Sequence, residues 1–117
     1  MGSIDIDAHI STADISLDLV KDLARLEPFG TGNPHPQFAV SEIRIREKNR
    51  LGASGDHLKL KIAGRDGMIL PAIGWNWGDR ADDFPADIDL SMAVQLDTNV
   101  WQDKKSVQLL ILDVKEK

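Results

Sequence analysis

Seven basic side chains fall within residues 38–66 of this 117-residue chain, against four acidic ones. Lysine and arginine clusters of this kind bind the phosphates of nucleic acid. The flanking segments 1–27 and 79–97 carry six acids each, and the net charge is −5, so any phosphate-binding surface has to be a local strip. With two lysines further along the chain, the candidate phosphate contacts are Arg44, Arg46, Lys48, Arg50, Lys59, Lys61, Lys104 and Lys105. The alternative interpretation of this composition is that water-facing strands simply carry charged outward side chains.

Single-strand binding also needs aromatic rings on which bases stack. The chain offers three tryptophans and no tyrosine. Trp77 lies between asparagine and glycine and is our candidate for an exposed stacking ring. Trp75 shares the alternation of the apolar residues before it, which predicts a core position. Trp101 is expected to pack across one end of the fold. His57 is expected to be a solvent-facing strand residue rather than a base contact.

Groups that could carry catalysis are dispersed along the chain. The three histidines are His9, His35 and His57, and none has a metal-ligand partner at helix or strand spacing. The close carboxylate pairs at 82–83 and 87–89 are expected to form a solvated acidic surface. We therefore expect no metal or other cofactor in this chain and no enzymatic activity of its own. Independent catalysis would require metal-dependent cleavage of an oligonucleotide by this chain.

The elements that must position the basic strip are predicted to be strands. Ile43 and Ile45 alternate with arginines, but Phe38 and Val40 have the opposite parity. A bulge near Ser41–Glu42 would direct both apolar sets inward, as a strand bending into a closed barrel requires.

Four more strands are predicted after it. Residues 57–62 alternate cleanly, a turn at 64–67 leads into a strand over 68–75, and a short helical or irregular link covers 79–85. Strands are then predicted at 88–96 and 107–111, with a hairpin loop at 101–105. Five strands with an irregular link between the third and fourth predict a mainly β fold, a five-stranded oligonucleotide/oligosaccharide-binding (OB) barrel. An SH3-like barrel is the nearest alternative.

Three segments are expected along the chain: a leader strand and helix at 1–27, a Pro/Gly junction at 28–37 and the barrel at 38–117. Residues 4–7 are expected to form the leader strand. Apolar residues at helical spacing, capped by Ser16 or Asp14, predict a short helix that packs on the barrel. These are Leu19, Val20, Leu23 and Leu26. The junction should be rigid, with Phe29 packing the helix onto the next element of the chain.

Composition sets broad limits. A hydrophobic content of 42% is enough for one domain with a single core. No apolar run approaches the roughly 18 residues of a membrane span, and we expect no membrane partner. The absence of cysteine fits a cytoplasmic location.

The stretch Leu26-Glu27-Pro28-Phe29-Gly30, followed by Gly32-Asn33-Pro34 and Pro36, resembles the junction ahead of the OB barrel in bacterial RecJ single-strand exonucleases. Three later pieces match in the same order. They are His57-Leu58-Lys59-Leu60-Lys61, Ala72-Ile73-Gly74, and Trp101 followed by Ser106-Val107-Gln108-Leu109. The resemblance extends from about residue 5 to residue 114.

This resemblance implies an excised auxiliary domain that holds single-stranded DNA for a 5′-to-3′ exonuclease in DNA repair and recombination. The family's Asp-His-His motifs and its Mn²⁺ or Mg²⁺ belong to other domains. Expected partners are single-stranded DNA, those catalytic domains and other repair proteins. About three or four phosphates would be neutralised without base-specific readout. The competing hypothesis is a structural or protein-docking module that braces the nuclease core or recruits a repair partner.

Overall fold

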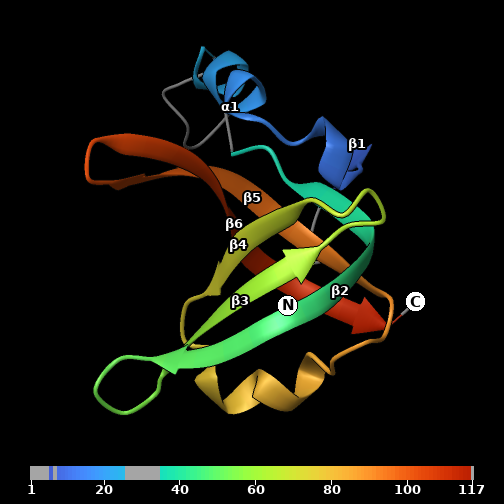
Figure 1. Cartoon of the computed structure of the whole chain (residues 1–117), viewed down its shortest axis with the longest axis vertical. Coiled ribbons are helices and arrows are strands. Elements are labelled where there is room, and N and C mark those ends of the chain that lie inside the picture. Colours follow the sequence, from blue (N-terminus) through green and yellow to red (C-terminus); the bar gives the residue numbers. More distant parts are fainter. Residues whose placement is uncertain (1–5, 7, 26–34, 117) are drawn as a thin grey trace.

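The computed structural model describes residues 6, 8–25 and 35–116, and in this part of the chain five long strands close into one barrel (Figure 1). The elements are β1 (Ala8–Ile10), η1 (Thr12–Asp14), α1 (Leu17–Ala24), β2 (Phe38–Leu51), β3 (His57–Ala63), β4 (Ile69–Gly74), η2 (Gly78–Asp83), β5 (Leu90–Trp101) and β6 (Lys104–Glu116). The strand order is β1-β2-β3-β4-β6-β5, and β2 also pairs with β5, which closes the barrel. The β4–β6 pair is parallel, whereas the other pairs within the barrel are antiparallel.

The bulge predicted near Ser41–Glu42 is confirmed. The register of β2 against β5 shifts between Val40 and Ile43, and Glu42 has a φ of 60°. Phe38 and Val40 before the bulge and Ile43 after it are all buried. Because of the bulge, both halves of this long strand contribute buried side chains to the same core.

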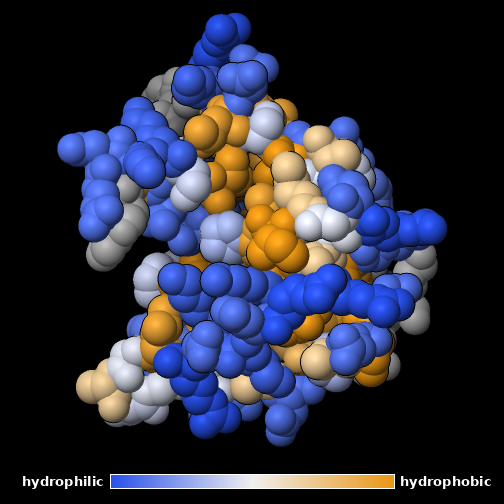
Figure 2. Space-filling model, viewed as in Figure 1, coloured by the Kyte–Doolittle hydropathy of each residue, from blue (hydrophilic) through white to orange (hydrophobic). Residues whose placement is uncertain are grey.

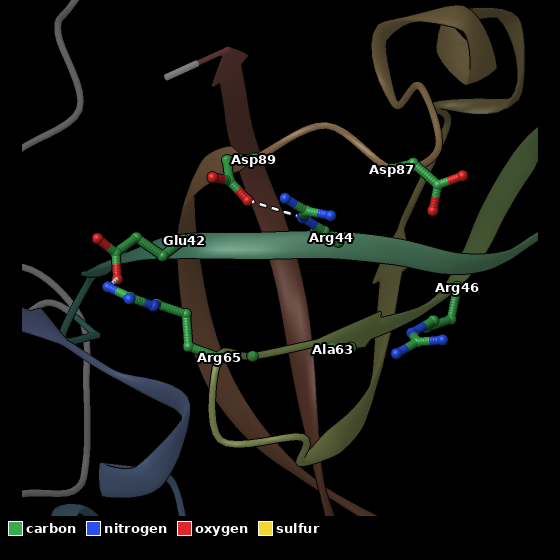
Figure 3. A pocket seen from close by; sticks show the side chains of 8 residues that line it. Glu42, Arg44, Arg46, Ala63, Arg65, Asp87 and Asp89 are labelled. Carbon is green, nitrogen blue, oxygen red and sulfur yellow. Dashed lines mark hydrogen bonds and ion pairs between the residues drawn. The ribbon is translucent and has the colours of Figure 1, made fainter.

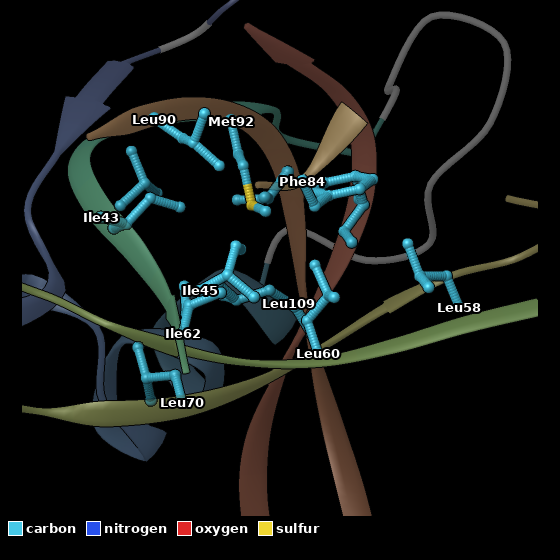
Figure 4. Close-up of a cluster of buried hydrophobic side chains, with 14 of the residues drawn as sticks. Ile43, Ile45, Leu58, Leu60, Ile62, Leu70, Phe84, Leu90, Met92 and Leu109 are labelled. Carbon is cyan, nitrogen blue, oxygen red and sulfur yellow. The ribbon is translucent and has the colours of Figure 1, made fainter. Parts of the chain in front are cut away.

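The core consists of inward side chains from all five barrel strands, closed at one end by Phe84 (Figure 4). Phe84 follows η2 and has none of its surface exposed. Its ring centroid lies 5.5 Å from that of Trp77. The sequence predicted this region only as a link, so the burial of Phe84 is a structural finding.

The predicted turns are also present. Gly67 N–H donates to the Gly64 carbonyl (3.0 Å), which closes the β3–β4 turn, and η2 occupies the predicted link. The β5–β6 hairpin is tighter than the loop predicted at 101–105, because β5 extends to Trp101 and β6 begins at Lys104. The turn consists of Gln102 and Asp103, both with positive φ (49° and 62°). Two consecutive left-handed residues are the geometry of a two-residue turn that follows the twist of its strands.

Helix α1 packs on the barrel as predicted. Its N-cap is Ser16, whose hydroxyl accepts from Leu19 N–H (3.1 Å). Of the predicted stripe, Val20 and Leu23 rest against the core, joined by Leu17. Leu19 is not among the residues packed on the core, and Leu26 lies outside the described residues. Asp14 instead forms a capping box with Ser11 one turn earlier. No helix in the described residues is long and apolar enough to cross a membrane.

The leader forms a strand at Ala8–Ile10, which pairs in parallel with Phe38–Val40 of β2. Its pairing with the barrel was not predicted from the sequence. The strand expected at residues 4–7 lies outside the described residues apart from Ile6, and so does the packing predicted for Phe29.

Thr12 and Asp66 connect the leader to the β3–β4 turn. The Thr12 hydroxyl donates to Asp66 Oδ1 (2.7 Å), and the same carboxylate accepts from Met68 N–H (3.2 Å). Thr12 is only 4% exposed. A Cβ on Gly64 would overlap the Thr12 side chain, so glycine there permits this close approach.

This connection should depend on pH. Hydrogen bonds from Thr12 and then from the Met68 amide lower the pKa of Asp66. A lowered folded-state pKa contributes stability that is present above the unfolded value of about 3.9 and is lost as the pH falls through the folded value. We expect Asp66→Asn to be less stable than the wild type at pH 7 and the difference to shrink toward zero below about pH 4. Urea unfolding across this range measures it, and a pH-independent difference would contradict the assignment.

Candidate nucleic-acid interface

A second bulge in β2 divides the predicted basic strip. The register against β3 passes from Ile45↔Ile62 directly to Glu47↔Lys61, so Arg46 and Glu47 both lie opposite Lys61. Beyond it, Lys48 pairs with Leu60 and Arg50 with Leu58. Leu60 and Leu58 are buried inward residues, and directly opposed residues share a face of the sheet. Lys48 and Arg50 therefore lie on the opposite face from Lys59 and Lys61, so the basic residues predicted from the sequence are divided between two faces.

Lys48 is engaged within the fold. Its ammonium donates to the carbonyl oxygens of Ala81 (2.9 Å) and Phe84 (3.3 Å). These carbonyls lie in the last turn of η2 and just after it, where a positive charge is favourable. Lys48 thus ties the end of η2 to β2.

Lys59 and Lys61 lie on the outward face of β3. Lys59 pairs with Ile73 of β4, and Lys61 pairs with Pro71. Lys61 also contacts Glu47 across the strand pair (3.4 Å), whereas no described carboxylate lies within ion-pair distance of Lys59. Each lysine is thus beside an apolar residue of the next strand.

An apolar band runs along this face. Figure 2 shows apolar side chains gathered over β4 and between β4 and α1, bordered by hydrophilic side chains over β2 and β3. Met68 and Ile69 begin the band at the start of β4 and are exposed. Ile73 beside Lys59 is only 7% exposed, so the apolar side chains of β4 that reach solvent here are Ile69 and, in part, Pro71. The face therefore combines a row of charge with a limited apolar surface, and single-strand binding would also use aromatic rings.

A hollow of about 550 Å³ lies beside the first half of β2 and holds three arginines and three carboxylates (Figure 3). Arg44 pairs with Asp89 (2.9 Å) and Arg65 with Glu42 (3.0 Å). These hydrogen bonds raise the pKa values of Arg44 and Arg65. Arg46 lines the same hollow, and among the described residues no carboxylate pairs with it. Arg46 is the one of the three arginines that forms no ion pair with a described residue, and Asp87 lines the same hollow.

Lys104 and Lys105 begin β6 and are exposed. They pair with Trp101 and Val100 across the hairpin. Figure 1 shows the β2–β3 loop and the β5–β6 hairpin extending from the same side of the barrel, with the end of β4 between them. In OB folds the corresponding loops flank the ligand-binding face.

Trp77, the predicted stacking residue, is half-buried against the core. The Arg80 guanidinium carbon lies 4.0 Å from the centroid of the Trp77 ring, and Phe84 approaches it from within the barrel. A base stacking on the face under Arg80 would have to displace that guanidinium. Its role in binding stays a prediction.

The prediction that Trp75 belongs to the core is wrong, because its side chain is 55% exposed. Leu70 and Ala72 of β4 join the core cluster, and Ile73 is also buried, but the alternation ends before Trp75, which follows β4. The strand carries apolar residues on both faces, so alternation alone could not identify the inward one. For Trp101 the structure gives no side-chain description, and its predicted packing is not tested.

His57 is half-exposed, and its ring makes two contacts within the fold. Its Nδ1 accepts from Asn76 N–H (2.9 Å), and its ring meets that of Trp75 edge-on, with centroids 5.0 Å apart and planes at 80°. No group of three or more histidine, aspartate or glutamate side chains placed to hold a metal ion occurs among the described residues. Asp83 and Asp89 are instead paired with Arg80 and Arg44.

The closed five-stranded barrel, its parallel β4–β6 pair and the helical link between β4 and β5 define an OB fold, the architecture expected from the sequence. The SH3-like alternative is thereby excluded. The chain belongs to the RecJ OB domain family, whose model matches residues 6–113.

Known relatives agree with this assignment. The chain is 26% identical over 109 residues to the single-stranded-DNA-specific exonuclease RecJ of Bacillus subtilis, covering 93% of this chain but only 14% of that protein. The crystal structure of Thermus thermophilus RecJ with Mn²⁺ matches with a TM-score of 0.66 at 29% identity, over 86% of this chain and 14% of that one. The structure of SSBb, the second single-stranded DNA binding protein of Mycobacterium smegmatis, shares the fold. It matches with a TM-score of 0.55 at 20% identity, over 69% of this chain and 84% of that one.

Proposed function

We propose that this chain is the domain of a RecJ-like exonuclease that holds single-stranded DNA by its phosphate backbone, without reading base sequence. The observation that carries the proposal is the outward face of β3 and β4, where Lys59 and Lys61 lie beside Ile73 and Pro71. The names of the relatives, single-stranded-DNA-specific exonucleases, support the same ligand.

The geometry of this face suits an extended strand of DNA. Lys59 and Lys61 are two residues apart on one strand, a spacing of about 7 Å. Their ammonium groups are flexible point charges, which follow phosphates without fixing a base. Arg46 at one end and Lys104 and Lys105 at the other extend the positive path, and about three or four phosphates are neutralised in total.

The apolar band favours single strands over duplex. Unpaired bases can turn toward the exposed Ile69 and the half-buried Pro71 of β4, whereas paired bases are stacked inside the double helix. Phosphate contacts alone would bind both forms. Preference for the single strand therefore depends on the apolar row as much as on the lysines.

In the longer protein, we propose, this domain holds the strand while other domains degrade it from 5′ to 3′ in DNA repair and recombination. The divalent metal of the reaction would be bound in those domains, and the Thermus RecJ structures are described in complex with Mg²⁺ and Mn²⁺. This chain would contribute binding and no catalysis. A cytoplasmic location fits this role.

A protein-docking role is the second candidate. It is favoured by the neutralised arginine pairs beside β2, which reduce the local positive charge, and by the exposed apolar band. A module bracing the nuclease core or recruiting a repair partner would use such a face for protein contacts.

Titration of isotope-labelled chain with a single-stranded thymidine oligonucleotide, followed by amide chemical shifts, tests the proposal. We expect the shifts to concentrate on β3, β4 and the two flanking loops, and to leave α1 unchanged. Shifts confined to α1 and the leader, or no shifts at millimolar DNA, would favour the docking role.

A further inference from the structure

We propose that Trp75 and His57 form a stacking site for one unpaired nucleobase at the end of β4, an inference that rests on the proposed function and adds its aromatic contact. Trp75 is 55% exposed. Of the tryptophan and phenylalanine side chains that the structure describes, it is the one that is mostly in water. Leaving such a ring in water forgoes the favourable free energy of burying it.

The Trp75 ring is oriented by His57, which is itself fixed by the backbone of Asn76. Its ring meets His57 edge-on at 5.0 Å, and the next residue, Asn76, donates its backbone N–H to His57 Nδ1 (2.9 Å). Asn76 has a φ of 65°, a left-handed conformation that asparagine tolerates better than most residues. This turn separates the exposed Trp75 from Trp77, which folds back against the core. A ring oriented by such a contact loses less conformational freedom when a ligand binds than an unsupported ring would.

The surroundings match a nucleotide. Trp75 follows the end of β4 and continues the alternation of Ile73, which is 7% exposed and pairs with Lys59. A base on Trp75 thus has a lysine within the reach of the neighbouring phosphate. Because His57 Nδ1 accepts a hydrogen bond, the neutral ring carries its proton on Nε2, which is a donor for a base carbonyl or a phosphate oxygen. Leu51, opposite His57, adds apolar surface on the same face.

The experiment compares two labelled oligonucleotides of equal length, one of thymidines and one whose sugars carry no bases, each binding to the full chain and to Trp75→Ala. Loss of one stacked base should weaken thymidine binding by about 5- to 150-fold and leave binding of the base-free strand unchanged. Trp75→Phe should restore most of the affinity, since it retains a ring. Ile88→Ala, another exposed apolar residue, is the matched control and should bind both strands as the wild type does.

Equal binding of the thymidine oligonucleotide by the wild type and Trp75→Ala would overturn the stacking site while leaving backbone binding intact. Equal weakening on both oligonucleotides would also overturn it, because the ring would then not act through a base. If the wild type binds neither strand, the proposed function itself fails, and the stacking site with it.

Discussion

Reversing both lysines of β3, in Lys59→Glu/Lys61→Glu, is expected to abolish binding of single-stranded DNA. The two ammonium groups lie on the outward face beside Ile73 and Pro71, and reversal replaces two attractive phosphate contacts with two repulsive ones. At about 20 mM salt, where screening is weak, we expect the affinity to fall by at least about 100-fold. Fluorescence anisotropy of a labelled oligonucleotide measures the change.

The matched control is Lys21→Glu/Lys115→Glu, which changes two exposed lysines on α1 and the end of β6. Each double variant takes the net charge from −5 to −9, because each lysine-to-glutamate change removes two units. Binding should weaken far less in the control. Equal loss in both variants would mean that only total charge matters, and no loss in either would contradict a phosphate path on β3. Both variants should stay folded, since exposed ion pairs such as Lys61–Glu47 contribute at most about 1 kcal/mol.

The largest loss of stability is expected for Phe84→Ala. Phe84 is completely buried at one end of the barrel, and Trp77 packs against it. Truncation of a buried phenylalanine costs about 3–5 kcal/mol, a large part of the 5–15 kcal/mol that typically stabilises a domain. The free energy of unfolding in urea should fall by about that amount.

The control for this variant is Ile88→Ala, four residues further along and 42% exposed. It should change the free energy of unfolding by less than about 0.5 kcal/mol. A Phe84→Ala protein within about 1 kcal/mol of the wild type would show that the barrel can close around the missing ring, contrary to the packing described.

The first bulge of β2 was predictable because apolar residues lie on both sides of it. Phe38 and Val40 have one parity and Ile43 and Ile45 the other, and a single core can accept both sets only across an inserted residue. The clean alternation of β3, the turn at Gly64 and the helical link were predictable for similar local reasons. The general architecture therefore follows from the pattern of apolar side chains.

The second bulge of β2 has no such signature in the sequence. From Arg46 to Arg50 every side chain is charged or polar, so no apolar residue shows which face each one occupies. The register shift at Glu47 arises from the pairing of β2 with β3. This shift directs the Lys48 side chain to the Ala81 carbonyl oxygen of η2. The composition of the basic strip was therefore visible in the sequence, but its division between two faces was not.

The position of Trp75 and the pairing of the leader strand could not be predicted from the sequence pattern either. The inward face of β4 cannot be chosen when Ile69 and Leu70 are both apolar, and only the barrel shows that Trp75 faces outward. The pairing of β1 with β2 joins residues about thirty positions apart. No local pattern in three residues specifies such a partner.

The most direct test of a phosphate-tracking single-strand interface is anisotropy of a labelled thymidine oligonucleotide titrated with this chain at about 20 mM and about 200 mM salt, with a duplex of equal length alongside. Three or four neutralised phosphates predict that the affinity for the single strand falls by about 100- to 600-fold over this tenfold change in salt. The duplex should bind more weakly at both concentrations. Absence of binding at the lower salt concentration, or equal affinity for the duplex, would contradict the account.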